Sequence, residues 1–166
     1  WASVSAGPGW ASAIKDDGTL WIWGQNQQGQ LGQGDVVYRS SPTQVGSLTD
    51  WAKVGPSKTG SVTAIKTDGT AWAWGYNGTG RLGLGDTLNK SSPVQIGSNT
   101  TWASVSVASV IALVSTTGKL YTCGNNYSGM MGVGDVVSRS SPVQVGSASW
   151  ANVGAGGNGG IGGVTT

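Results

Sequence analysis

The chain contains LWIWGQNQQGQLGQGD at residues 20–35 and nearly the same stretch, AWAWGYNGTGRLGLGD, at residues 71–86. A third copy with more substitutions, LYTCGNNYSGMMGVGD, occupies residues 120–135. The copies begin 51 and then 49 residues apart. Self-similarity at a fixed period of about 20 to 50 residues is the sequence signature of repeat architectures such as solenoids and propellers. The repeat therefore decides the fold class before any single residue is considered.

The residues around these copies repeat at the same spacing. A Trp-Ala-x-Val motif begins at Trp1, Trp51, Trp102 and Trp150, and a Ser-Ser-Pro-x-Gln motif begins at Ser40, Ser91 and Ser140. These motifs divide the chain into three whole repeats and the start of a fourth, at residues 1–50, 51–101, 102–149 and 150–166. We expect all of them to belong to one domain, because a single repeat of this length cannot bury its apolar face alone.

Each repeat alternates short β-prone runs with turn signals. In the first repeat the runs WASVS, ASAIK, TLWIW and TQVG are rich in Trp, Ile, Val and Thr, and Asp16–Gly18 is a hairpin turn signal. No window has the apolar spacing of a helix, and glycine recurs too often for a helix interior. We therefore predict an all-β fold with propeller blades of about four antiparallel strands each. The three to four blades that the repeats supply are expected to be part of a larger or oligomeric propeller.

The composition excludes several kinds of chemistry. The chain has no His, no Glu and one Cys, Cys123, so it cannot supply a His-based triad, a Glu general acid or a His/Cys zinc site. Nine Lys and Arg residues against seven Asp leave a net charge of +2 without a basic run, and no nucleic-acid partner is expected. No apolar stretch approaches the length of about 18 residues that a membrane-spanning helix needs. We expect no enzyme activity, no cofactor, no metal and no membrane span.

The glycine-rich end of each copy has two functional interpretations and one structural one. A phosphate-binding loop would need a helix after the glycines and a Lys-Ser/Thr ending, and neither is present. Calcium-binding β-rolls place their Asp residues in coils about nine residues apart, whereas Asp35, Asp86 and Asp135 are about fifty residues apart. We expect each Asp to accept hydrogen bonds from backbone N–H groups of its own loop.

The repeat resembles that of the regulator of chromosome condensation family. The resemblance rests on a column order kept across the copies, at Trp23, Gly24, Asn26, Asp35, Trp74, Gly75, Asn77, Asp86, Gly124, Asn126 and Asp135. The third copy departs from it, because Cys123 replaces the Trp of Trp-Gly. The resemblance implies a β-propeller, usually of about seven blades. The expected partners are therefore further repeats of the same chain or other protein chains.

The tryptophans of the third run in each copy are predicted to be core residues. Trp21, Trp23, Trp72 and Trp74 alternate along short strands beside small and aliphatic residues. Some proteins similar to this family sense ultraviolet light with clustered tryptophans and repeat a Gly-Trp-Arg-His-Thr motif. This chain has only Gly9-Trp10-Ala11-Ser12, once. A packing role explains the tryptophans without photochemistry.

A variable loop follows each repeated Asp and places three residue pairs at equivalent positions on one rim. These pairs are Tyr38 with Arg39, Asn89 with Lys90, and Ser138 with Arg139. One interpretation is a contact surface for an acidic or glycan partner. The other, which we favour, is a surface ion pair between each Arg or Lys and the Asp four residues earlier.

The resemblance alone does not choose a function. Family members serve as GTPase exchange factors, photoreceptors, inhibitors of β-lactamase and repeat modules of surface proteins, all on the same scaffold. The low charge and the abundance of Gly, Ser, Thr, Asn and Gln lead us to expect a non-enzymatic structural or adhesive module of a microbial or phage surface assembly. Such a protein would be extracellular or on a virion, would act through protein contacts, and would have a glycan or surface receptor as a further candidate partner. The alternatives are an intracellular binding propeller, cytoplasmic or nuclear, that acts as a GTPase exchange factor or chromatin-associated regulator, and an enzyme-inhibitor propeller.

Overall fold

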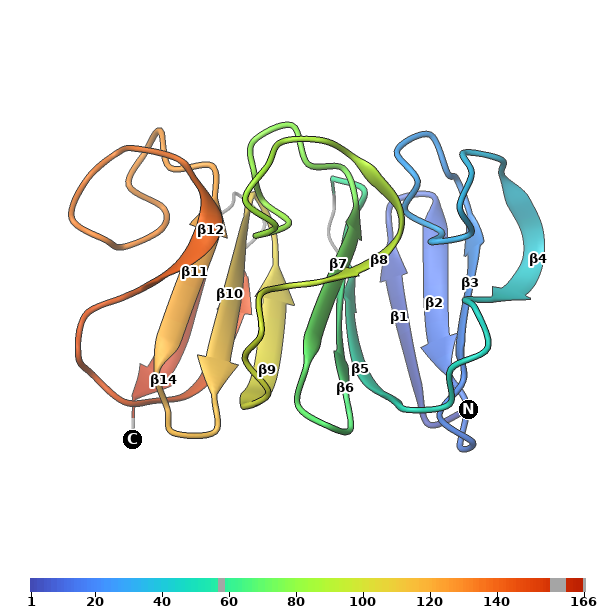
Figure 1. Ribbon diagram of the computed structural model, residues 1–166, viewed down its shortest axis with the longest axis horizontal. Coiled ribbons are helices and arrows are strands. Elements are labelled where there is room, and N and C mark those ends of the chain that lie inside the picture. The colour runs from blue at the N-terminus through green and yellow to red at the C-terminus, as the bar shows by residue number, and fades with distance from the viewer. Residues whose placement is uncertain (57–58, 156–160, 166) are drawn as a thin grey trace.

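The computed structural model of the chain describes residues 1–56, 59–155 and 161–165, and every regular element in these ranges is a β-strand (Figure 1). The strands in chain order are β1 (Ser3–Gly7), β2 (Trp10–Ile14), β3 (Leu20–Gly24), β4 (Arg39–Gln44), β5 (Trp51–Pro56), β6 (Ser61–Lys66), β7 (Ala71–Gly75), β8 (Lys90–Gln95), β9 (Trp102–Val107), β10 (Val110–Ser115), β11 (Leu120–Gly124), β12 (Arg139–Gln144), β13 (Trp150–Ala155) and β14 (Ile161–Thr165). Residues 156–160 and 166 of the predicted fourth repeat lie outside the described residues.

Four consecutive strands form each of the first three sheets. The sheets are β1 to β4, β5 to β8 and β9 to β12, each in sequential antiparallel order, and β13 pairs with β14. Figure 1 shows the first three sheets side by side in chain order. The predicted all-β fold with four-stranded antiparallel units is confirmed. The predicted turn at Asp16–Gly18 joins β2 to β3, with the Gly18 N–H donating to the Lys15 carbonyl at 2.9 Å.

The fourth strand of each sheet lies at an edge. Among the strands that the structure describes, β4, β8 and β12 each pair with one neighbour, and each contains the proline of a Ser-Ser-Pro motif. Proline has no backbone N–H to donate and is tolerated in sheets at edges. The register shifts where Gly24 pairs with Arg39, and equivalent shifts occur in the other two sheets. The outer strand is thus bent at the position where the basic residue of the repeat begins it.

The hydrophobic core lies between neighbouring sheets. One cluster joins residues of the first and second sheets around Ile22 and Trp74, a second joins the second and third sheets around Leu82 and Ile111, and a smaller one reaches Val153 of β13. Every residue of β6 and of β10 is buried, because these strands have a sheet on both sides. Each large apolar side chain buried in this way contributes about 1.5 to 3 kcal/mol.

The first strands of successive repeats converge. β5 packs against β1, β9 packs against β5, and β13 packs against β9. In a propeller the blades approach one another at their inner strands, around the axis. The first strand of each repeat is therefore the inner strand of its blade, and the Pro-containing fourth strand is the outer one.

The predicted core role of the tryptophans is fulfilled to different degrees. Trp74 is fully buried, whereas Trp21, Trp23 and Trp72 are half-buried. The Trp21 and Trp72 rings stand on the same face of their blades, and each lies beneath a lysine ammonium, at 3.8 Å from Lys15 and 4.5 Å from Lys66 respectively. The lysine stems and charges cover these rings at the blade edge, so that packing continues beyond the apolar core.

Candidate partner-binding rim

Three long loops on the same side of the molecule join the third strand of each sheet to the fourth. We call them the rim loops and define them as residues 25–38, 76–89 and 125–138. They form the upper edge in Figure 1. Their glycines turn the chain back on itself: in the first loop, Gly29 and Gly32 have φ of 79° and 67°, and their N–H groups donate to the carbonyls of Asn26 and Gly29. Only glycine adopts such positive φ values readily.

A buried asparagine holds each rim loop together. Asn26 is fully buried, and its Nδ2 donates to the backbone carbonyls of Asp35 and Val37 at 3.0 and 3.1 Å. Its Oδ1 accepts the Leu31 N–H at 2.9 Å. The same bonds are made by Asn77 in the second loop and by Asn126 in the third. The buried amide is satisfied on both its ends, and the loop is fixed around it.

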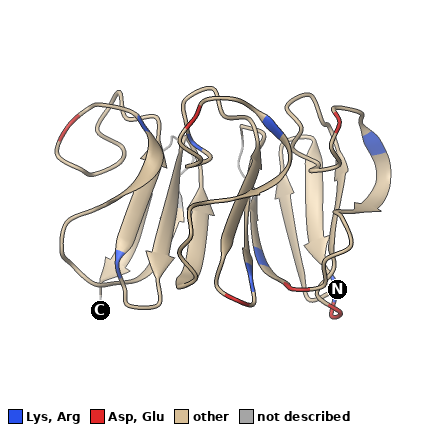
Figure 2. Ribbon diagram, viewed as in Figure 1, with Lys and Arg blue, Asp and Glu red and all other residues tan. Residues whose placement is uncertain are grey.

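The repeated Asp closes the same loop from outside. Asp35 Oδ1 accepts the Val37 N–H at 2.9 Å, and Oδ2 pairs with Arg39 Nη2 at 2.6 Å. The backbone N–H of Val37 and then the Arg39 guanidinium hold the pKa of Asp35 below its usual value. Equivalent ion pairs join Asp86 to Lys90 at 2.7 Å and Asp135 to Arg139 at 2.6 Å. The structure thus contains the ion pairs that the sequence led us to favour. Each joins an Asp of a rim loop to the basic residue that begins the next strand, so that acidic and basic residues lie together along this edge (Figure 2).

Apolar side chains at one to three positions after the repeated Asp are exposed in all three rim loops. We define the apolar rim as Val36, Val37, Tyr38, Leu88, Val136 and Val137, which are 50% to 67% exposed. Single exposed apolar residues are ordinary on protein surfaces, but these recur at equivalent places in three successive loops. The backbone of Val37 is held on both sides, since its N–H donates to Asp35 and its carbonyl accepts from Asn26. Its side chain is left outside the loop.

The six rim positions singled out in the sequence have unequal surroundings. Tyr38 is half exposed and makes no hydrogen bond within the described residues. Asn89 instead links two blades, because its Nδ2 donates to Gln28 Oε1 of the first rim loop at 2.7 Å and its Oδ1 accepts the Asn77 N–H. Ser138 Oγ accepts the Asn126 N–H at 3.1 Å. A partner contact at these positions stays a prediction. The valines and the leucine beside them were not singled out in the sequence, although an apolar residue occupies the second position after every repeated Asp.

The first two rim loops also rest on the next blade. The Gly34 N–H donates to the Ser91 carbonyl of β8 at 2.8 Å, and the Gly85 N–H donates to the Ser140 carbonyl of β12 at 2.7 Å. The Trp74 indole N–H donates to the carbonyl of Gln30, in the first loop, at 2.9 Å. These bonds make the rim part of the packed scaffold instead of a set of independent loops.

The described residues offer little for chemistry. They contain no group of three or more His, Cys, Asp or Glu side chains placed to hold a metal ion. Burial raises the pKa of the Cys123 thiol to about 12, so this thiol stays protonated and is a poor nucleophile at neutral pH. Within the same ranges, no helix has the length and apolarity that crossing a membrane requires.

Comparisons with known proteins agree with the repeat and the fold. The family model of the regulator of chromosome condensation (RCC1) repeat matches residues 17–60 and 68–112, together more than half of the chain. The mitochondrial RCC1 domain-containing protein RUG3 of Arabidopsis thaliana is 32% identical over 110 residues, and protein RCC2 of Mus musculus is 39% identical over 85 residues. The aligned regions cover 65% and 50% of this chain but only 24% and 16% of those relatives.

The solved structure of Prp20p from Saccharomyces cerevisiae superposes on 99% of this chain with a TM-score of 0.85 and 18% sequence identity. The superposition covers 44% of Prp20p, whose structure was reported with its binding properties toward Gsp1p and histones. At this identity the likeness is one of fold. The chain spans about a quarter or less of the length of the two curated relatives and under half of Prp20p.

Proposed function

The chain belongs to the RCC1 repeat family, and on this premise we propose that it is part of a β-propeller that binds another protein through the apolar rim. The observation that carries the proposal is the repeated presentation of exposed apolar side chains on loops that are already fixed. Each loop is held by a buried Asn and by an ion-paired Asp. A surface that is ordered before binding loses less conformational entropy when a partner docks.

A folded protein with an apolar patch fits this rim better than a strongly charged partner. The Asp charges are compensated by Arg39, Lys90 and Arg139, and the chain carries a net charge of +2. A basic partner such as a histone would need an acidic surface for electrostatic complementarity. Prp20p, the fold relative, is named with two binding partners, Gsp1p and histones. For this chain we therefore propose a partner of the Gsp1p kind, which we take as a small GTPase of the sort that exchange factors of the family act on, and not histones.

This proposal replaces the surface-assembly function expected from composition. One relative is named as mitochondrial, and none of the relatives reported above is described as a surface or virion protein. The support thus favours the alternative, an intracellular binding propeller. We propose no reaction for the chain itself, and we propose that the partner is bound by blades of which this chain supplies three and the beginning of a fourth.

The test is a set of charge substitutions that leave the loop backbone bonds intact. The rim variant carries Val37→Asp, Leu88→Asp and Val137→Asp, because these side chains point away from the loops that their backbones hold. The control variant carries Asp at three exposed valines outside the rim, Val4, Val94 and Val143. Binding to purified Gsp1p in its nucleotide-free state and to core histones is measured by calorimetry.

We expect the wild-type chain and the control variant to bind the GTPase with similar affinity. The rim variant should bind at least about thirtyfold more weakly, which corresponds to the loss of one hot-spot contact of about 2 kcal/mol. Equal losses in the rim and control variants would contradict the assignment of the surface. Binding to histones alone would contradict the assignment of the partner class.

A further inference from the structure

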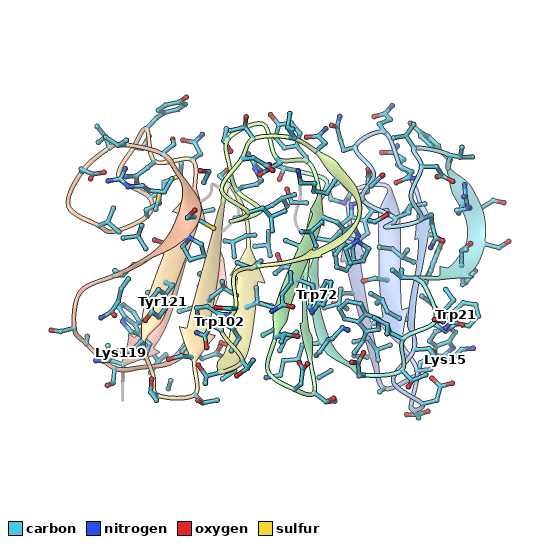
Figure 3. The ribbon with its side chains drawn as sticks, viewed as in Figure 1. Lys15, Trp21, Trp72, Trp102, Lys119 and Tyr121 are labelled. Atoms are coloured by element: carbon cyan, nitrogen blue, oxygen red, sulfur yellow. The ribbon has the colours of Figure 1, made fainter. Side chains whose placement is uncertain are left out.

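A groove of about 500 Å³ lies between the first and second sheets, and its lining includes no residue of the apolar rim. Its walls include Gln33 from the first rim loop, Gln44 from β4, Trp51 and Trp72 from the second sheet, and Pro93 from β8. Figure 3 labels Trp72 on the lower part of the second sheet. A pocket of this size with an aromatic wall and a few polar groups has the make-up of a ligand site.

The repeat generates an equivalent groove, of about 540 Å³, between the second and third sheets. Trp102, Gln95 and Pro142 line it at the positions that Trp51, Gln44 and Pro93 have in the first groove. The second groove therefore serves as an internal reference, since the two share a backbone frame and differ in side chains.

The glutamine of the outer strand is in a different state in the two grooves. In the second groove Gln95 Nε2 donates to the Gly97 carbonyl at 3.1 Å, and in the third repeat Gln144 does the same with Gly146 at 2.8 Å. The side-chain amide of Gln44, by contrast, makes no hydrogen bond within the described residues. In the first groove it is therefore available to a ligand, both as donor and as acceptor.

A second difference lies opposite Gln44. Gln33 replaces the leucine that stands at position 84 in the second groove. Its Nε2 donates to the backbone carbonyls of Leu31 and Gln44 at 3.3 and 3.1 Å, which leaves its Oε1 as a further acceptor. The first groove thus contains two amide groups with unused hydrogen-bonding capacity.

The aromatic wall of the first groove is fixed before any ligand binds. The Trp72 ring packs edge-on against Trp51 with centroids 6.2 Å apart, and its indole N–H donates to Thr70 Oγ1 at 2.9 Å. Lys66 lies over both rings and pairs with Asp50 at 3.4 Å, so that its charge is already compensated. The buried Trp51 indole N–H, in contrast, has no hydrogen-bond partner among the described residues, and the same is true of Trp102 in the second groove.

We propose that the first groove binds an uncharged proline-rich segment of another protein in the polyproline II conformation. Such a segment has no internal hydrogen bonds, so that its carbonyls accept from side-chain amides such as that of Gln44. Its rings pack on aromatic walls, and its stiffness reduces the entropy lost on docking. The absence of an uncompensated charge among the lining residues matches an uncharged ligand. This site shares no residue with the apolar rim and does not depend on the GTPase proposed above.

The test uses a capped decaproline peptide and nuclear magnetic resonance of the isotopically labelled chain. The reporters are the Gln44 side-chain amide and the Trp72 indole N–H. A Gly-Ser peptide of equal length and a chitin oligosaccharide are the comparison ligands. The variants are Gln44→Ala and its matched control Gln95→Ala, which removes the glutamine of the second groove that is already hydrogen-bonded to Gly97. Because both glutamines are partly exposed, both variants are expected to fold, which the amide spectrum verifies.

We expect decaproline alone to shift the Gln44 and Trp72 signals in a saturable manner. Loss of one hydrogen bond in Gln44→Ala should weaken binding about threefold to tenfold, whereas Gln95→Ala should bind as the wild type does. Unshifted signals at millimolar decaproline would overturn the proposal. Equal weakening in both variants would place the ligand elsewhere, and shifts with the oligosaccharide but not with decaproline would make the groove a glycan site and likewise overturn it.

Discussion

The contact between the first and second blades and the contact between the second and third use the same backbone with different side chains. At the first contact the Trp74 indole N–H donates to the Gln30 carbonyl at 2.9 Å. At the second contact the Cys123 thiol takes the place of the indole and lies 3.7 Å from the Arg81 carbonyl. Gly34 and Gly85 make the same backbone bond to the next blade in both cases. The backbone frame of the repeat therefore survives the loss of an entire indole ring.

The cross-strand partners of Trp74 and Cys123 differ in size. Trp74 pairs with Val62 across β6 and β7, whereas Cys123 pairs with the larger Ile111 across β10 and β11. The loop carbonyl that each side chain contacts belongs to Gln30 in the first case and to Arg81 in the second, and both residues are buried. The smaller Cys123 is thus accompanied by a larger cross-strand partner, which offsets part of the volume that the indole ring fills in the second blade.

Removal of Trp74 should have the largest effect on stability. Trp74→Ala deletes a fully buried ring and its hydrogen bond, and we expect a loss of about 3 to 5 kcal/mol in the free energy of unfolding. Cys123→Ala removes a single sulfur atom from the equivalent position and should cost about 1 kcal/mol. Urea denaturation followed by circular dichroism measures both free energies. Equal losses of stability in the two variants would contradict the different packing of the two contacts.

A glycine that rests on the next blade should be less replaceable than one that does not. Gly80 and Gly129 have φ of 72° and 70°, so that alanine strains the backbone at both by about 1 to 2 kcal/mol. At Gly80 the added Cβ would lie 2.7 Å from Ser140 Cα, whereas at Gly129 the nearest atom is 4.0 Å away.

We therefore expect Gly80→Ala to cost about 2 to 4 kcal/mol, because backbone must also move, and Gly129→Ala to cost the strain alone. Melting temperatures of the two variants, measured side by side, decide between these outcomes. A larger loss for Gly129→Ala would contradict the docking of the second rim loop.

Introduction of tryptophan at position 123 tests whether the compensation is specific. Cys123→Trp should destabilise the chain by about 1 to 3 kcal/mol, because Ile111 occupies part of the space that the ring needs. Combined with Ile111→Val, which recreates the pair of the second blade, the substitution should cost less. A double-mutant cycle on urea midpoints measures the coupling, and strict additivity would refute the idea of paired exchange.

The loss of stability at acidic pH that depends on Asp86 should be the smallest of these effects. The Lys90 ammonium and then the Leu88 N–H lower the pKa of Asp86 in the folded chain. A carboxyl with a depressed folded pKa contributes stability that is complete above its unfolded pKa, about 3.9, and is lost as the pH falls through the folded pKa. The wild type should therefore lose stability below about pH 4 with a steeper slope than Asp86→Asn. Identical slopes in the two denaturation series would contradict this role of Asp86.

The repeat allowed most of the fold to be predicted, because strands, turns and the edge prolines are local features that recur in register. The pairing of Asp35 with Arg39 was also predictable, since the two residues are only four apart in the sequence. The exposure of Val36 and Val37 was not, because adjacent valines in a sequence indicate burial as readily as display. Their direction depends on Asn26, which holds the loop from inside. The groove at Gln44 could not be predicted either, because its walls come from two blades.

Hydrogen–deuterium exchange of the chain in solution tests most directly whether the rim loops are ordered before a partner binds. The Leu31, Leu82 and Met131 amides, each bonded to a buried Asn, should be protected to a similar degree, because this bond lies within each loop. The Gly34 and Gly85 amides should be protected by the next blade, and the Gly134 amide, for which no such bond is formed within the described residues, should exchange fast. Exchange of the Leu31, Leu82 and Met131 amides at the rate of an unstructured peptide would contradict a rim that is ordered before it binds.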